Sequence, residues 1–131
     1  MRDTLAMSPK EKHVLARDHL DLAREEIDGG HAGLAATLLL HAAEAAIDAL
    51  AEQNGIETSP THWRRGEIVA ELNQRGIGSS DDGDLVRLLN EERKGYAYDG
   101  DEPEFNGDTA EHIATRVERL VISAEEAWSD V

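Results

Sequence analysis

Arg93 is the residue of this chain whose type and position are best suited to chemistry. At 3.6 residues per turn, it falls within the stripe that Leu85, Leu89 and Tyr96 form on a helix predicted from about Asp81 to Tyr98. Because a guanidinium group keeps its charge, an arginine on a core-facing stripe needs a carboxylate, a phosphate or a water-filled cleft. The alternative is that Arg93 lies at the edge of the stripe, where the aliphatic part of its side chain covers apolar surface and its guanidinium group is in water.

Candidate partners of Arg93 lie on another predicted helix, from about His31 to Asn54. Four polar residues share one narrow stripe of that helix, at i, i+4, i+7 and i+11: Thr37, His41, Glu44 and Asp48. One interpretation is that this stripe is the solvated side of a packed helix. The other is that it lines a polar cleft, in which Arg93 is largely buried and pairs with Glu44 or Asp48.

Trp63-Arg64-Arg65, preceded by His62, is the only compact group of basic and aromatic residues in the sequence. Such a group could stack on a base and contact phosphate. The alternative is that it anchors the start of a helix onto a neighbour, with both arginines solvated.

The six histidines raise the question of a metal site. Di-iron bundles use Glu-x-x-His from each of two helices, whereas the nearest arrangement here, His41-x-x-Glu44, is reversed and occurs once. The sequence contains no glycine-rich phosphate loop and no motif for nucleophilic catalysis. It therefore predicts neither a metal nor a cofactor.

The net charge of −15 arises from 28 acidic residues against 13 lysines and arginines. Such a surface repels phosphate backbones, so any RNA contact has to be local, in a cleft where a few arginines outweigh the general field. The absence of cysteine fits a reducing compartment. Since no apolar run of roughly 18 residues and no signal segment is evident, the sequence predicts a cytoplasmic protein without a membrane contact.

The apolar periodicity predicts an all-α fold, a compact up-and-down bundle of four to five helices. One domain is expected over residues 8–131, after a flexible lead-in at residues 1–7. The predicted helices run from about Pro9 to Asp28, His31 to Asn54, Thr61 to Arg75, Asp81 to Tyr98 and Asp108 to Trp128. The second is apolar nearly all round, which is typical of a helix at the centre of a bundle or in an oligomer interface.

Capping residues set several of these boundaries. Ser8, followed by proline and by Glu11, predicts a capping box at the first helix. Ser80 is the predicted cap of the fourth helix, and Asp108 with Glu111 forms an acidic relative of the capping box at the last one.

With the helices placed, the chain resembles the HEPN domain family over about Ser8 to Trp128. The resemblance rests on the alanine-rich second helix (Leu38 to Ala46), on the fourth helix ending Leu88 to Tyr98, and on the loop and amphipathic helix that follow Glu102-Pro103. It implies a helical bundle that dimerises. Many members of the family are metal-independent ribonucleases of toxin–antitoxin or defence systems, and others bind RNA or a partner, often beside a nucleotidyltransferase.

The nuclease motif of that family is an arginine, a spacer of four to six residues and then a histidine. Arg93 matches the arginine, but the position five residues beyond it is Tyr98, and the next histidine is His112. A histidine exchanges a proton near neutral pH, whereas tyrosine, with an ordinary pKa of about 10, is a poor general base. Tyr98 could still stack on a base, donate a hydrogen bond or orient a phosphate.

The resemblance therefore suggests a dimeric, RNA- or nucleotide-directed component of a toxin–antitoxin or stress-type system, with a nucleotidyltransferase-type or other protein as its partner. Arg93 and Tyr98 are the candidate catalytic residues, and the candidate binding residues are Tyr96, His41, Glu44 and Asp48. The alternative is a non-catalytic protein-interaction bundle, in which Arg93 is a structural ion-pair residue and the acidic surface meets a basic protein.

Overall fold

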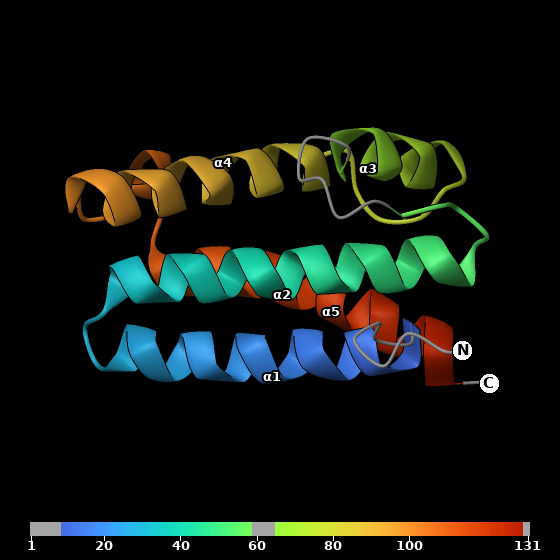
Figure 1. The fold of residues 1–131 in the computed structure, drawn as a ribbon, viewed down its shortest axis with the longest axis horizontal. Helices are drawn as coiled ribbons and strands as arrows, with labels where there is room; N and C mark the ends of the chain where they lie inside the picture. Colours follow the sequence, from blue (N-terminus) through green and yellow to red (C-terminus); the bar gives the residue numbers. More distant parts are fainter. Residues whose placement is uncertain (1–8, 59–64, 130–131) are drawn as a thin grey trace, which may run out of the picture.

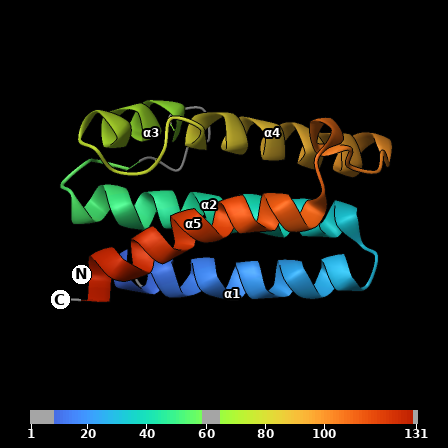
Figure 2. The same ribbon diagram turned by 180° about the vertical axis from the view of Figure 1, so that it is seen from behind.

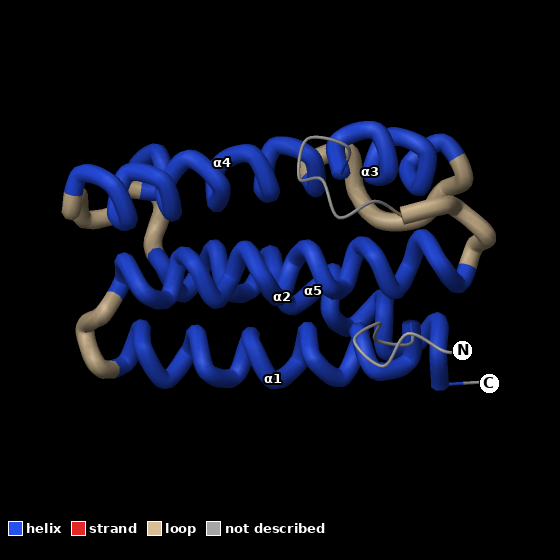
Figure 3. Tube along the Cα trace, viewed as in Figure 1, coloured by secondary structure: helices blue, strands red, loops and turns tan. Residues whose placement is uncertain are grey.

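The computed structural model of the chain describes residues 9–58 and 65–129, and all regular structure in these ranges is helical (Figure 3). The α-helices are α1 (Pro9–Asp28), α2 (Ala32–Gln53), α3 (Arg65–Gln74), α4 (Asp82–Lys94) and α5 (Ala110–Ser129). The π-helix η2 (Gly95–Asp99) and the 3-10 helix η3 (Phe105–Gly107) lie between α4 and α5. The predicted all-α bundle of four to five helices is confirmed.

Several predicted features lie outside the described residues. These are the lead-in at residues 1–7, the Ser8 cap of α1, the start of the third helix near Thr61, and the pair Trp63-Arg64. Arg65 is the first described residue of α3.

The helices α1, α2, α4 and α5 run alternately in opposite directions, and α3 continues the line of α4 (Figures 1 and 2). In the middle lies α2, which packs against α1, α4 and α5. Because 15 of its 22 residues are buried, the prediction that this apolar helix belongs at the centre of a bundle is confirmed.

The helix α2 is also long and apolar enough to cross a membrane, so the prediction that no segment reaches that length was wrong. In the fold, however, 72% of its apolar window is buried. A central core helix and a membrane span meet the same test of length and composition. Contacts within the bundle therefore account for the apolar composition of α2.

The core is aliphatic, as the composition predicts, and α5 contributes the stripe that its periodicity predicts. Its buried residues are Ile113, Ala114, Val117, Leu120, Val121 and Ala124. Near the end of α5, the indole nitrogen of Trp128 donates a hydrogen bond of 3.0 Å to the carbonyl of Ala49 on α2. This bond satisfies the only polar atom of the indole ring, which lets Trp128 pack partly buried against the central helix.

The predicted caps of α4 and α5 both differ from the structure. The residue that precedes α4 is Asp81, whose side chain makes no capping hydrogen bond, so the prediction that Ser80 caps this helix was wrong. The turn before α4 is organised instead by the backbone N–H of Ser79, which donates to Oδ2 of Asp82 at 2.8 Å. At the start of α5, Oγ1 of Thr109 accepts the backbone N–H of His112 at 3.1 Å, one position after the predicted cap. The lengths of both helices change little as a result.

Candidate functional site

Arg65, at the start of α3, is the arginine that occupies the acidic stripe of α2. Its Nη1 donates to Oε2 of Glu44 at 2.8 Å, and its Nη2 donates to Oδ2 of Asp48 at 2.9 Å. All three side chains are buried, and Arg65 is only 8% exposed. The prediction that Glu44 and Asp48 pair with Arg93 was therefore wrong, and so was the prediction that Arg65 is solvated.

The fork of the guanidinium group explains why this pairing is favourable. Glu44 and Asp48 are four residues apart, so their carboxylates lie one above the other on α2, and two nitrogens of one planar group reach both. Burial nevertheless raises the pKa of Asp48, and the hydrogen bond and charge of Arg65 oppose that rise. This cluster has the role of a structural ion pair that one sequence interpretation gave to Arg93.

Arg93 lies in the last turn of α4, partly exposed, at the edge of the stripe formed by the buried Leu85 and Leu89. Its Nη2 donates to Oδ1 of Asn90 at 3.2 Å. Its Nε is buried and donates to no described residue. No carboxylate in the described ranges pairs with it, so the structure provides no partner there for the structural ion pair of the alternative interpretation.

Tyr96 follows Arg93 on η2 and lies against the first turn of α2. A Cβ atom added at Gly33 would lie 2.1 Å from Cδ1 of the Tyr96 ring. Gly33 therefore permits a contact that a larger residue would exclude, although Tyr96 remains 39% exposed. The ring presents one side to the protein and another to solvent.

Tyr98 is the most exposed large hydrophobic residue in the part of the chain that the structure describes, at 77%. It lies on η2, where the backbone changes from α-helix to π-helix at Gly95 instead of continuing as the predicted α-helix to Tyr98. Single π-helical turns are rare and often occur at functional sites. An aromatic ring displayed in this way is available for stacking on a ligand.

The loop that follows η2 is attached to α4 by one carboxylate. Oε1 of Glu92 accepts the backbone N–H of Phe105 at 3.2 Å, and Oε2 accepts that of Glu104 at 3.3 Å. Phe105 is buried and has a φ of +47°, which is unusual for a residue with a side chain. Glu92, which precedes Arg93 in the sequence, therefore holds the loop in a strained conformation.

His41 is separated from the other predicted binding residues of α2. Its ring centroid lies 5.6 Å from that of His19 on α1. Burial lowers the pKa of His19, and the neighbouring His41 lowers it further. The predicted polar stripe is thus divided: His41 borders α1, whereas Glu44 and Asp48 bind Arg65.

The structure brings Arg93, Tyr96 and Tyr98 together at one end of the bundle and places α3, with Arg65, toward the other end (Figure 1). The first group combines a positive charge with two partly or fully exposed aromatic rings. The second consists of one buried guanidinium group that is already paired with two buried carboxylates. Only the first has the composition of a ligand-binding surface.

Neither a protein-family model nor a curated protein matches this chain. The resemblance to the HEPN family consequently rests on the residue patterns quoted above, and the candidate site rests on its geometry.

Proposed function

We propose that the surface formed by Arg93, Tyr96 and Tyr98 binds RNA or a nucleotide, and that the chain is a HEPN-like component of a toxin–antitoxin or stress-type system. One observation carries the proposal: Arg93 is partly buried, yet no carboxylate of the described chain neutralises it. A phosphate group would provide that missing charge.

The chemistry of the neighbouring residues supports this ligand. A guanidinium group binds phosphate oxygens through parallel hydrogen bonds. Exposed tyrosine rings stack on unpaired bases, a contact worth about 1–3 kcal/mol per base. Because the chain carries a net charge of −15, the general field repels nucleic acid, and binding depends on this local group of residues.

Binding is favoured over cleavage by the identity of residue 98. General base catalysis at neutral pH requires a group that exchanges protons there, which histidine does and an ordinary tyrosine does not. In the binding role, Arg93 holds the phosphate, while Tyr96 and Tyr98 orient the adjacent bases. If cleavage occurs, Arg93 stabilises the negative charge of the phosphorane and Tyr98 positions the phosphate or the 2′-hydroxyl.

Dimerisation is part of the proposal, and exposed apolar residues along the seam between α1 and α2 support it. Leu22 on α1 is 47% exposed and Leu34 on α2 is 44% exposed. The contact between His19 and His41 shows that these faces of the two helices adjoin. Light scattering at tens of micromolar tests this part: we expect a dimer mass, which Leu34→Glu reduces to that of a monomer. A monomer mass for the unmodified protein would contradict it.

The binding proposal is tested with a labelled single-stranded RNA in an anisotropy titration, alongside a cleavage assay on the same RNA. Arg93→Ala should weaken binding about tenfold or more. The slope of the logarithm of the binding constant against the logarithm of the salt concentration should also become less steep, by the amount expected for the loss of about one phosphate contact. Tyr98→Ala should weaken binding, whereas Tyr98→Phe keeps the stacking ring and should retain most of the affinity.

Arg87→Ala is the matched control, because Arg87 lies on the same helix, is exposed and pairs with Asp84 at 2.8 Å. It should bind RNA like the unmodified protein. Equal affinity of Arg93→Ala and Arg87→Ala would overturn the proposal, as would the absence of saturable RNA and nucleotide binding. Cleavage lost in Arg93→Ala would extend it from binding to catalysis.

A further inference from the structure

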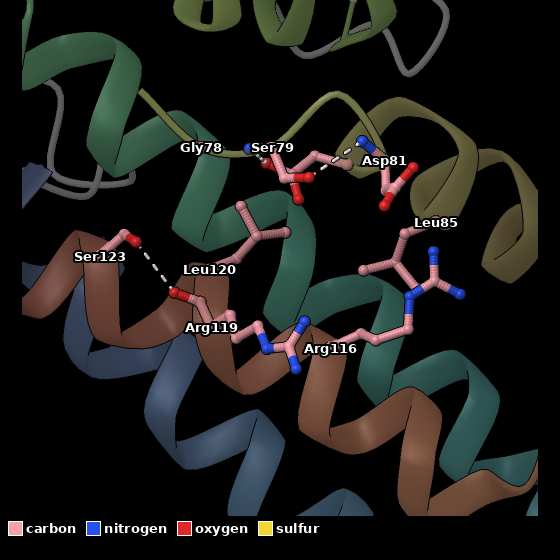
Figure 4. A pocket seen from close by; sticks show the side chains of 9 residues that line it. Gly78, Ser79, Asp81, Leu85, Arg116, Arg119, Leu120 and Ser123 are labelled. Carbon is pink, nitrogen blue, oxygen red and sulfur yellow. Dashed lines mark hydrogen bonds between the residues drawn. The ribbon is translucent and has the colours of Figure 1, made fainter. Parts of the chain in front are cut away.

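A polar cavity lies between the turn that precedes α4 and the outer side of α5 (Figure 4). Its volume is about 240 Å³. Arg116 and Arg119 line it from α5, and Asp81 and Asp82 line it from the turn. It is formed at the start of α4, whereas Arg93 lies at the other end of that helix, so the two sites are separate.

The arginines of this cavity are unusual for the chain because no described carboxylate forms an ion pair with them. Acidic residues outnumber lysine and arginine by 28 to 13. Five other arginines each pair with a carboxylate: Arg17, Arg24, Arg65, Arg75 and Arg87. Arg116 and Arg119 are one helical turn apart and extend along the same side of α5 beneath the turn. The charge of Arg116 does act on Asp82, where it opposes the rise in pKa that burial causes, but neither arginine is held in an ion pair with a described carboxylate, so both guanidinium groups can form hydrogen bonds to a ligand.

The opposite side of the cavity carries hydrogen-bond acceptors. Asp82 is held in place because its Oδ2 accepts the backbone N–H of Ser79 at 2.8 Å. Gly78, with a φ of +77°, makes this approach possible, since a Cβ there would lie 2.5 Å from the same oxygen. Asp81 is exposed, and its carboxylate accepts no hydrogen bond from the described residues. Asp81 can therefore accept hydrogen bonds from a ligand.

We propose that this cavity binds a small phosphomonoester that also carries hydroxyl groups, with its phosphate against Arg116 and Arg119 and a hydroxyl donating to Asp81. Two guanidinium groups match the charge and the several acceptor oxygens of a phosphate. The carboxylates exclude a second anionic group but accept hydrogen bonds from hydroxyls. The cavity lies slightly below the range of about 300–1,000 Å³ that is usual for ligand sites, which fits a sugar phosphate.

The carbon skeleton of such a ligand has apolar neighbours within the same cavity. Leu85 of α4 and Leu120 of α5 both line it, and both are buried by the fold. A sugar ring at this wall of the cavity would place its carbon atoms against the small part of the two side chains that remains exposed, while its hydroxyls face the turn. A free sugar phosphate and the sugar phosphate portion of a nucleotide have this chemistry in common.

Calorimetric titration of the full chain with ribose 5-phosphate, adenosine 5′-monophosphate, ribose and inorganic phosphate tests the proposal. We expect saturable binding of ribose 5-phosphate, weaker binding of inorganic phosphate and no binding of ribose. Equal binding of the two phosphomonoesters would indicate that the sugar phosphate portion is recognised. Tighter binding of adenosine 5′-monophosphate would indicate a nucleotide ligand. No saturable binding of either phosphomonoester, or equal binding of inorganic phosphate, would overturn the proposal.

Variants assign the binding to the cavity. Arg116→Ala and Arg119→Ala should each weaken ribose 5-phosphate binding about tenfold, whereas Arg87→Ala, outside the cavity, should leave it unchanged. Asp81→Asn keeps a residue suited to a helix start. It should weaken ribose 5-phosphate binding but not inorganic phosphate binding. Thermal melting of each variant shows that the fold is retained, and unaltered binding by both arginine variants would overturn the proposal.

Discussion

Arg65 lies at the start of α3 and Arg93 at the end of α4, on the same side of α2. The two arginines differ in burial and in the pairing of their charges. Arg65 is buried and binds two carboxylates of α2. Arg93 is partly exposed, and its side chain forms one hydrogen bond with the described residues, to Asn90. The difference shows that a buried charge is tolerated where acids are spaced to receive it, whereas an unpaired arginine at a surface is available for binding.

The largest expected effect is that of Arg65→Ala on stability. Removing this guanidinium group leaves Glu44 and Asp48 buried without their shared cation, which should cost about 3–5 kcal/mol in the free energy of unfolding. Urea unfolding followed by circular dichroism measures the change, with Arg87→Ala as the control for losing an exposed arginine. A variant as stable as the unmodified protein would show that the cluster does not stabilise the fold.

Asp48→Asn should have a smaller, pH-dependent effect, because Arg65 keeps its bond to Glu44. Burial raises the pKa of Asp48 in the folded state above its ordinary value. The folded state therefore binds this proton more tightly than the unfolded state, and the contribution of Asp48 to stability falls as the pH rises through the folded pKa. The asparagine variant lacks that fall, so its stability relative to the unmodified protein should increase over this pH range.

Urea unfolding at a series of pH values measures this difference, with Asp84→Asn as the control for losing an exposed carboxylate that is not part of the cluster. A difference between Asp48→Asn and the unmodified protein that stays constant from acid to neutral pH would contradict the prediction.

A double-mutant cycle at Gly33 and Tyr96 tests whether packing, rather than charge, holds the end of α4. Alanine favours a helix over glycine by up to about 1 kcal/mol, but in the unmodified protein the new Cβ would overlap the Tyr96 ring. Gly33→Ala should therefore stabilise the fold only when Tyr96→Ala is also present. Equal effects in both backgrounds, measured by thermal melting, would show that Tyr96 does not contact α2 in solution.

The smallest expected effect is that of Arg93→Ala on stability, about 0.5 kcal/mol, because the substitution removes one hydrogen bond from a partly exposed residue. The same variant should bind RNA about tenfold more weakly, or weaker still, in the titration described above. If Arg93→Ala lowered the free energy of unfolding as much as Arg65→Ala does, the two arginines would not differ, and Arg93 would have a structural role.

The fold could be predicted because its signals are local. The stripe of α5, the central position of α2 and the end of α1 before Gly29-Gly30 all follow from spacing and helix-breaking residues. The arginine that pairs with Glu44 and Asp48 could not be identified from such local signals. Glu44 and Asp48 show that a cation should bind there, but the choice between Arg65 and Arg93 depends on how α3 and α4 lie on α2, and that placement is a property of the tertiary structure.

For the candidate site, the grouping of its residues could be predicted from the sequence, but the conformation of its backbone could not. The proximity of Arg93, Tyr96 and Tyr98 in the sequence keeps them together in any helical conformation, so their grouping was predictable. The change to a π-helix at Gly95 was not, because it alters the direction of each side chain without a distinctive residue pattern. The cavity beside Arg116 and Arg119 was also missed, since it joins the turn before α4 to a helix that is distant in the sequence.

The alternating direction of the helices also determines how this domain can be attached to something else. The first turn of α1 and the last turn of α5 lie at the same end of the bundle, and η2 lies at the opposite end (Figures 1 and 2). A further domain, an affinity tag or a solid support joined beyond Pro9 or Ser129 would therefore extend away from Tyr98. Immobilisation through either of these ends should leave the surface around Arg93 open to solution, which makes capture of RNA on a tethered domain a practical assay.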